Sequence, residues 1–157
     1  MRFDARTVAA AMVLAAGASL ARADDTPDRY PGSVLYDAPV KVADGVYSAI
    51  GATQPPTYEN AGHNNNLSFI VTTDGVAVGN GGASWKLAEA LHAEIRKITD
   101  QPVRLVINEN GQGHSMLGNS YWAAQGVPIL AHEAAAADFI DSEGPRGLEA
   151  LKAYARE

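Results

Sequence analysis

The stretch from Val103 to Asn119 constrains the fold of this chain more than any other. It begins with Val103 to Ile107, an apolar run typical of a buried strand, and continues into the polar run Asn108 to Ser115. A buried strand requires neighbouring strands on both sides, so this stretch predicts a sheet. The polar run combines amide, imidazole and hydroxyl groups at the end of that strand, and it is where chemistry is expected.

The segments on either side predict the rest of the sheet and the helices that cover it. Two hairpins come first, because Asp44-Gly45 and Thr73-Asp74-Gly75 are turn signals between β-rich runs. A helix with Ser84 as its N-cap is expected next, since apolar residues recur at helical spacing. The predicted helices and the last strand lie at about 85–98 (helix), 116–125 (helix), 127–131 (strand) and 133–141 (helix).

This order of elements indicates an α/β protein. Strands that alternate with helices favour a mostly parallel sheet covered by helices, here with antiparallel hairpins on one side. Ligands gather outside the carboxyl ends of the strands in such sheets. Three segments follow strands and are expected to converge on one edge: Asn80 to Ser84, Asn108 to Ser115, and His132-Glu133.

The first 23 residues have the pattern of an export signal. Arg2 and Arg6 precede an apolar stretch from Thr7 to Leu20, and Ala21-Arg22-Ala23 is an A-x-A cleavage site. The apolar stretch is shorter than the roughly 18 residues that span a bilayer. We expect a periplasmic or secreted protein, with a lead-in over 24–39 and one domain over 40–157.

Composition excludes several classes of partner and site. Without residues 1–23 the chain has 9 basic and 17 acidic residues and a net charge of −8, which disfavours nucleic acid and anionic membrane surfaces. The chain has no cysteine, so it has no disulfide, no thiolate metal ligand and no cysteine nucleophile. The expected partner is a small-molecule ligand or substrate, with no nucleic acid and no membrane after removal of the signal.

The segment from Gly51 to Asn66 is too polar and too broken by prolines to form a helix or strand. One interpretation is a plain connection. The other is a flap in which Tyr58 and His63 overhang a site, because long loops in compact domains are often functional. On the second interpretation, His63 contributes to ligand binding.

The polar run and its surroundings resemble the metallo-β-lactamase fold hydrolases. The central motif of that family runs Asn-Thr-His-x-His-x-Asp-His-x-x-Gly-Asn after a buried strand, and this chain has Asn108 at its start and Gly118-Asn119 at its end. Similar patterns extend over residues 40 to 141. The resemblance implies the first half of a four-layer αββα sandwich, with a mixed sheet and helices on its outer face.

The resemblance also identifies the positions at which the family binds metal. The family's His, His, Asp and His fall on Asn110, Gln112, His114 and Ser115 of this chain. Zinc is the implied cofactor, and His114, Asn110 and Gln112 are its implied ligands, with His114 as the candidate catalytic residue. Because zinc sites normally take His, Cys or carboxylate ligands, the motif is degenerate.

Two functions remain open. In the first, the chain is an exported hydrolase of the metallo-β-lactamase type with a remodelled zinc site. In the second, it is a non-catalytic protein that binds a small polar ligand through Asn110, Gln112, His114, Ser115 and His63. The family's second half is missing after Glu157, so we expect either self-association or a partner that supplies it, since the exposed sheet face would be a large apolar patch.

Overall fold

A computed structural model describes residues 32–57 and 60–144 of the chain. The expected export signal, the first part of the lead-in and Tyr58 lie outside the described residues. The described elements follow one another as β1 (Val40–Ala43), β2 (Val46–Ala49), β3 (Leu67–Thr72), β4 (Gly75–Gly79), α2 (Trp85–Ile98), β5 (Val103–Asn108), α3 (Gly113–Met116), α4 (Asn119–Ala124), β6 (Ile129–Ala131) and α5 (Glu133–Glu143).

The strands form one mixed sheet in the order β1-β2-β3-β4-β5-β6. The pairs from β1 to β4 are antiparallel, and β4, β5 and β6 are parallel. The expectation of a mostly parallel sheet was therefore wrong, because the two hairpins also pair with each other through β2 and β3. The predicted α/β class with a mixed sheet is confirmed.

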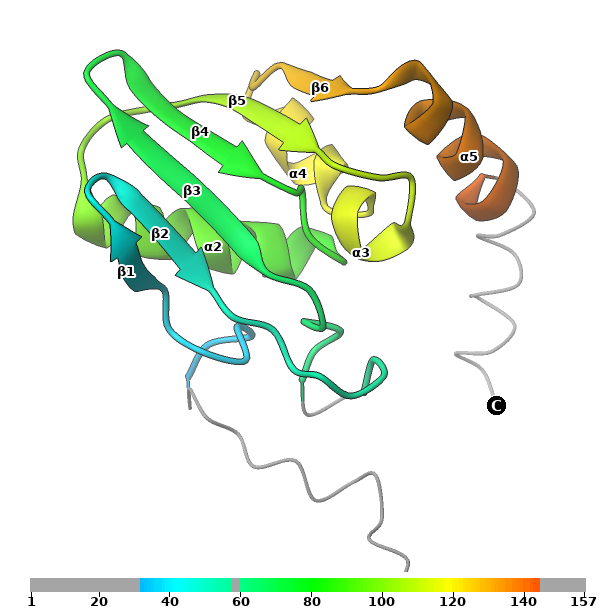
Figure 1. Cartoon of the computed structure of the whole chain (residues 1–157), viewed down its shortest axis with the longest axis horizontal. Coiled ribbons are helices and arrows are strands. Elements are labelled where there is room, and N and C mark those ends of the chain that lie inside the picture. The colour runs from blue at the N-terminus through cyan, green and yellow to red at the C-terminus, as the bar shows by residue number, and fades with distance from the viewer. Residues whose placement is uncertain (1–31, 58–59, 145–157) are drawn as a thin grey trace, which may run out of the picture.

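Helices α2 and α4 cover one face of the sheet (Figure 1). Helix α2 begins where the Ser84 hydroxyl accepts a hydrogen bond from the Leu87 backbone N–H at 3.1 Å. Its side chains at helical spacing face the strands and are fully buried, and the core they form consists mainly of Leu87, Leu91, Ile95, Phe69, Val78, Val106 and Trp122. The near face of the sheet in Figure 1 carries no helix among the described residues.

The single helix predicted over 116–125 is two helices, α3 and α4. The break lies at Gly118, whose backbone N–H donates to the Gly82 carbonyl at 2.7 Å instead of continuing a helix. A Cβ atom at Gly118 would collide with the Gly81 carbonyl oxygen. Close contact between two chain segments, which no local pattern reveals, therefore ends α3 after one turn.

Within residues 32–57 and 60–144, no helix is both long enough and apolar enough to cross a membrane.

Candidate functional site

The turn after β4 and the loop after β5 are joined by hydrogen bonds. The Asn80 N–H donates to the Ile107 carbonyl at 2.8 Å, and the Glu109 N–H donates to the Asn80 side-chain oxygen at 3.2 Å. Asn80 has a φ of 69°, a left-handed conformation that asparagine tolerates better than most residues. Two of the three segments expected to converge are thus brought together at one edge of the sheet.

Asn108 is the centre of this junction. Its side-chain oxygen accepts from the Gly81 N–H at 2.9 Å, and its amide nitrogen donates to the Asn119 side-chain oxygen at 3.1 Å. The Gly81 N–H also donates to the Ser115 carbonyl at 2.6 Å. With 3% of its surface exposed, Asn108 connects the β4 turn to the start of α4 and is part of the framework under the site.

Replacing Asn108 by alanine is expected to lower the free energy of unfolding by about 2 kcal/mol, because it leaves buried polar groups with fewer partners. Urea unfolding followed by circular dichroism would measure the loss. Asn66→Ala is the matched control, since Asn66 is exposed and accepts only one longer bond, from the Gly51 N–H at 3.3 Å. Equal stability of the two variants would contradict the role assigned to Asn108.

Asn110 and Gln112 lie on the surface of the loop after β5. The Asn110 side-chain oxygen accepts from the Gln112 N–H at 2.9 Å, and the Gln112 carbonyl accepts from the N–H groups of Ser115 and Met116. Gln112 is therefore the N-cap residue of α3, and its own side chain is exposed. Both residues line an open pocket of ≈ 680 Å³.

The opposite wall of this pocket is α5. It contributes Asp138 and Asp141, three residues apart on one side of the helix. Gly111 brings the loop directly against α5, since a Cβ atom there would meet the Ala135 carbonyl oxygen. The two aspartates were not among the residues predicted from the sequence. Their helical spacing is visible in the sequence, but the packing of α5 against the β5–α3 loop is not.

His114 and Ser115 lie within α3 and are not among the residues that line this pocket. His114 is partly buried. Ser115 is fully buried, and its hydroxyl has no hydrogen-bond partner in the described part of the chain. The predicted polar run therefore divides into pocket residues, Asn110 and Gln112, and helix residues, His114 and Ser115.

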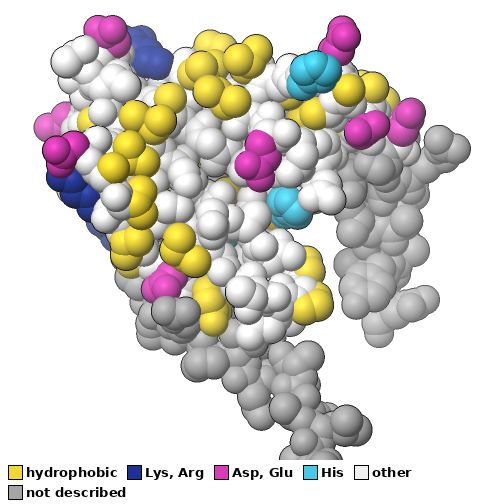
Figure 2. Space-filling view, viewed as in Figure 1, with side chains coloured by type: hydrophobic (Ala, Val, Ile, Leu, Met, Phe, Trp, Pro, Cys, Tyr) yellow, Lys and Arg dark blue, Asp and Glu magenta, His cyan; other side chains and the backbone are white. Residues whose placement is uncertain are grey.

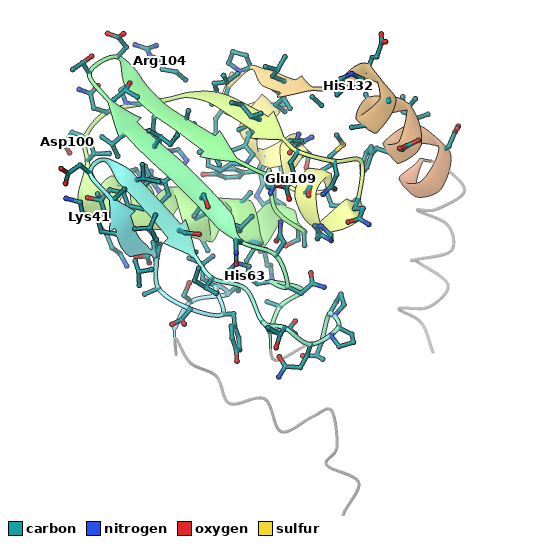
Figure 3. All side chains as sticks on the ribbon, in the orientation of Figure 1. Lys41, His63, Asp100, Arg104, Glu109 and His132 are labelled. Carbon is teal, nitrogen blue, oxygen red and sulfur yellow. The ribbon has the colours of Figure 1, made fainter. Side chains whose placement is uncertain are left out.

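His63 is buried within the segment from Gly51 to Asn66, which agrees with the interpretation of this segment as a connection and not with a flap in which His63 overhangs a site. Its side chain is fully buried, and Nδ1 accepts a hydrogen bond from the Tyr36 N–H at 2.9 Å (Figure 3). Burial lowers the pKa of His63 from 6.5 to about 4, although backbone groups of Ala49 and Asn65 and the charge of Asp37 act in the opposite direction. Through this hydrogen bond, the neutral imidazole connects the loop between β2 and β3 to Tyr36, which lies before β1.

The other two histidines have structural contacts. His132 is the N-cap of α5, where Nδ1 accepts from the Ala134 N–H at 3.1 Å. His92 of α2 lies 2.8 Å from the Tyr121 hydroxyl, and burial together with the charge of Arg96 lowers its pKa. His132-Glu133, the third segment expected at the site, therefore forms the start of α5, and neither residue lines the pocket.

The residues at the motif positions do not fit a zinc site. The Asn110 oxygen is already engaged by the Gln112 backbone, and Ser115 is enclosed within α3. Among the described residues, no three His, Cys, Asp or Glu side chains come close enough together to hold a metal ion. His114 is the only motif residue of a type that zinc normally takes.

No family model matches this sequence, and no curated protein matches it either. Solved structures do match its fold. They include metallo-β-lactamases from Erythrobacter litoralis (16% identity, TM-score 0.52, 69% of this chain and 44% of that one), Pontibacter korlensis (20%, 0.53, 69% and 47%) and Hirschia baltica (19%, 0.54, 66% and 46%). The Erythrobacter structure holds β-mercaptoethanol in its active site.

The chain spans less than half the length of each of these proteins. At identities of 16 to 20% the likeness concerns the fold, and it agrees with the resemblance that the sequence carries around Asn108 and Gly118-Asn119. This chain has the fold of the N-terminal half of a metallo-β-lactamase.

Proposed function

We propose that this chain binds a small polar ligand, without catalysing a reaction, in the pocket between the β5–α3 loop and α5. The observation that carries the proposal is the lining of the ≈ 680 Å³ pocket, which combines the amides of Asn110 and Gln112 with the carboxylates of Asp138 and Asp141. Carboxylate oxygens accept hydrogen bonds and amides do both, so the pocket suits a ligand with several hydroxyl or amino groups.

Charge narrows the class of ligand further. The chain has a net charge of −6, and the Asp141 carboxylate on the α5 wall gives this side of the pocket a negative charge. An anionic ligand would be repelled from this wall. The ligand is therefore a neutral polyol or sugar, or an amine.

The pocket walls are held in place before any ligand arrives. Gly111 packs its backbone against α5, where a Cβ atom would lie 3.0 Å from the Cβ of Asp138 and 3.1 Å from the Phe139 nitrogen. The Asn110 oxygen is held by the Gln112 N–H, so the Asn110 amide NH₂ and the exposed Gln112 side chain are the loop's groups for the ligand. Groups positioned in advance lose less entropy on binding.

A panel of polyols, sugars and short amines, with dicarboxylates as a negative set, tests the proposal by thermal shift and calorimetry. A neutral or amine ligand is expected to stabilise the protein, and Gln112→Ala should weaken its binding about tenfold, the effect of one lost hydrogen bond. Gln101→Ala is the matched control, because Gln101 is exposed and lies outside the pocket lining. Stabilisation by none of the panel, or equal affinities of both variants, would overturn the proposal.

Zinc-dependent hydrolysis is the second candidate, and the fold shared with metallo-β-lactamases favours it. This candidate requires a metal that His114 helps to hold. Elemental analysis of the purified protein should then find stoichiometric zinc that is lost in His114→Ala. A folded protein with less than about a tenth of an equivalent of zinc would exclude it.

We also propose that the protein is exported, as the pattern of residues 1–23 predicts. Cell fractionation and mass spectrometry of the mature N-terminus test this. A mature chain that begins at Asp24 supports it, and an intact Met1 in the cytoplasm opposes it.

A further inference from the structure

A groove of ≈ 530 Å³ lies between helix α2 and the segment that leads into β1. The three residues 32–34 form one wall. The other wall is a stripe along α2, in which the small side chains of Ala90 and Ala93 lie between charged ones at helical spacing. Charge distinguishes this groove from the face of the sheet in Figure 2, where hydrophobic side chains gather.

The described part of the chain begins inside this groove. Gly32, the first described residue, belongs to the lining. The chain is fixed shortly afterwards, because Leu35 is buried in the core and its N–H donates to the Ser33 hydroxyl at 3.1 Å. Consecutive Cα atoms are about 3.8 Å apart, so the residue before Gly32 must also lie at the groove.

Glu94 gives the groove a buried negative charge. The residue is only 8% exposed, and its carboxylate accepts a hydrogen bond from the Lys97 ammonium group at 2.7 Å. A carboxylate has two oxygens that together accept several hydrogen bonds, so a second cation can bind beside Lys97. Because a buried charge is costly unless it is well paired, the groove favours an occupant with a basic side chain.

We propose that this groove binds residues 24–31 of the same chain, with the Arg29 guanidinium group on the Glu94 carboxylate. Arg29 is the only basic residue in this segment, and Asp24, Asp25 and Asp28 supply negative charge for Lys86 and Lys97 at the two ends of the stripe. The pairing of opposite charges thus extends along the groove.

The chain is long enough for this pairing. Arg29 precedes Gly32 by three residues, which span at most about 10 Å when extended. The stripe from Glu89 to Lys97 rises by about 12 Å along α2, so the Arg29 side chain can reach Glu94 from Gly32. Pro27 and Pro31 also favour an extended chain over a helix.

The covalent connection at Gly32 favours this occupant over a separate molecule. A segment joined to the groove by a short link has an effective concentration of about a millimolar or more there. A free peptide or small molecule would have to displace it. The experiments below distinguish these occupants.

A double-mutant cycle in the purified protein tests the ion pair. Arg29→Gln and Glu94→Gln are each expected to lower the folding equilibrium constant about tenfold in urea unfolding, as for one lost hydrogen bond between charged groups. The double variant should be no less stable than Glu94→Gln alone, because the two changes remove the same contact.

Arg104→Gln is the matched control for this cycle, because Arg104 is exposed on β5 and lies outside the groove. Its effect is expected to add to that of Glu94→Gln. Additive effects of Arg29→Gln and Glu94→Gln would overturn the proposal.

Disulfide cross-linking tests the position of the segment, and the chain has no cysteine of its own to interfere. Thr26→Cys is expected to form a disulfide within one chain with Ala90→Cys or Ala93→Cys of the groove, and much less with Ala134→Cys, which is exposed on α5. Arg29→Gln should reduce the yield severalfold, since it weakens docking but leaves the covalent connection intact.

Two results of the cross-linking would overturn the proposal. A yield that Arg29→Gln leaves unchanged would mean that the covalent connection alone brings the cysteines together, as expected if another molecule occupies the groove. A disulfide that forms between two chains would mean that the segment binds a second copy.

Discussion

Replacing Trp122 by alanine is expected to lower the free energy of unfolding by about 3–5 kcal/mol, the usual cost of removing a large aromatic side chain from a core. Trp122 is fully buried on α4. Its ring packs edge to face against Tyr121, with centroids 5.2 Å apart, and lies 5.3 Å from the His92 ring. Alanine would leave a cavity between α4, α2 and the sheet.

The indole N–H adds a polar contribution to that loss. It donates to the Gly81 carbonyl at 3.1 Å in a buried position and so connects α4 to the turn after β4. Trp122→Phe keeps most of the volume but removes this donor, and its expected cost is about 1–2 kcal/mol. Comparing the two variants separates packing from hydrogen bonding.

Trp85 provides the control for this experiment. It is the other tryptophan, 45% exposed at the start of α2, and it meets the Tyr121 ring at 5.3 Å. Trp85→Ala is expected to cost about 1 kcal/mol, because most of the contribution is one aromatic pair. Urea unfolding followed by circular dichroism measures all three variants, and equal losses for Trp122→Ala and Trp85→Ala would contradict the assigned core.

Acid is expected to destabilise the folded chain through His63. Its pKa is about 4 in the folded protein and 6.5 in the unfolded chain. Above pH 6.5 the imidazole is neutral in both states and has no effect on the equilibrium. Between pH 6.5 and 4 the unfolded chain binds a proton that the folded protein does not, so stability falls by about 1.4 kcal/mol per pH unit, roughly 3 kcal/mol in all.

Burial is the main reason why the folded protein resists this proton, and the hydrogen bond at Nδ1 acts in the same direction. Nδ1 accepts from the Tyr36 N–H, and protonation would replace that acceptor with a donor as well as bury a charge. Unfolding by urea at a series of pH values from 7 to 4 measures the slope. In His63→Gln, whose side chain does not titrate, the free energy of unfolding should depend less steeply on pH over this range. An unchanged slope would show that other groups cause the loss of stability in acid.

Several parts of the fold could be predicted from the sequence because the relevant interactions are local. The Asp44-Gly45 and Thr73-Asp74-Gly75 turns do separate paired strands, and Ser84 does cap α2. The strand predicted over 103–107 is β5. Turn chemistry, capping and residue period act over a few residues, so they are visible without knowledge of the rest of the chain.

The candidate site was predicted only in part. Its location after β5 followed from the polar run, and Asn110 and Gln112 do line a pocket. The partners across that pocket, Asp138 and Asp141, come from a helix more than 20 residues further along the chain. No local pattern indicates that α5 folds back against Gly111.

The sequence by itself determined the strands, the main helix and the likeness to a metallo-β-lactamase fold, since period and turn residues are local properties. Only the tertiary structure decided what the polar residues do. It made Asn108 an internal connector, enclosed His63, and left Asn110 and Gln112 facing α5. The physical reason is that hydrogen bonding and burial depend on which distant segments meet, and the same amide is a ligand group on a surface but a structural group in a core.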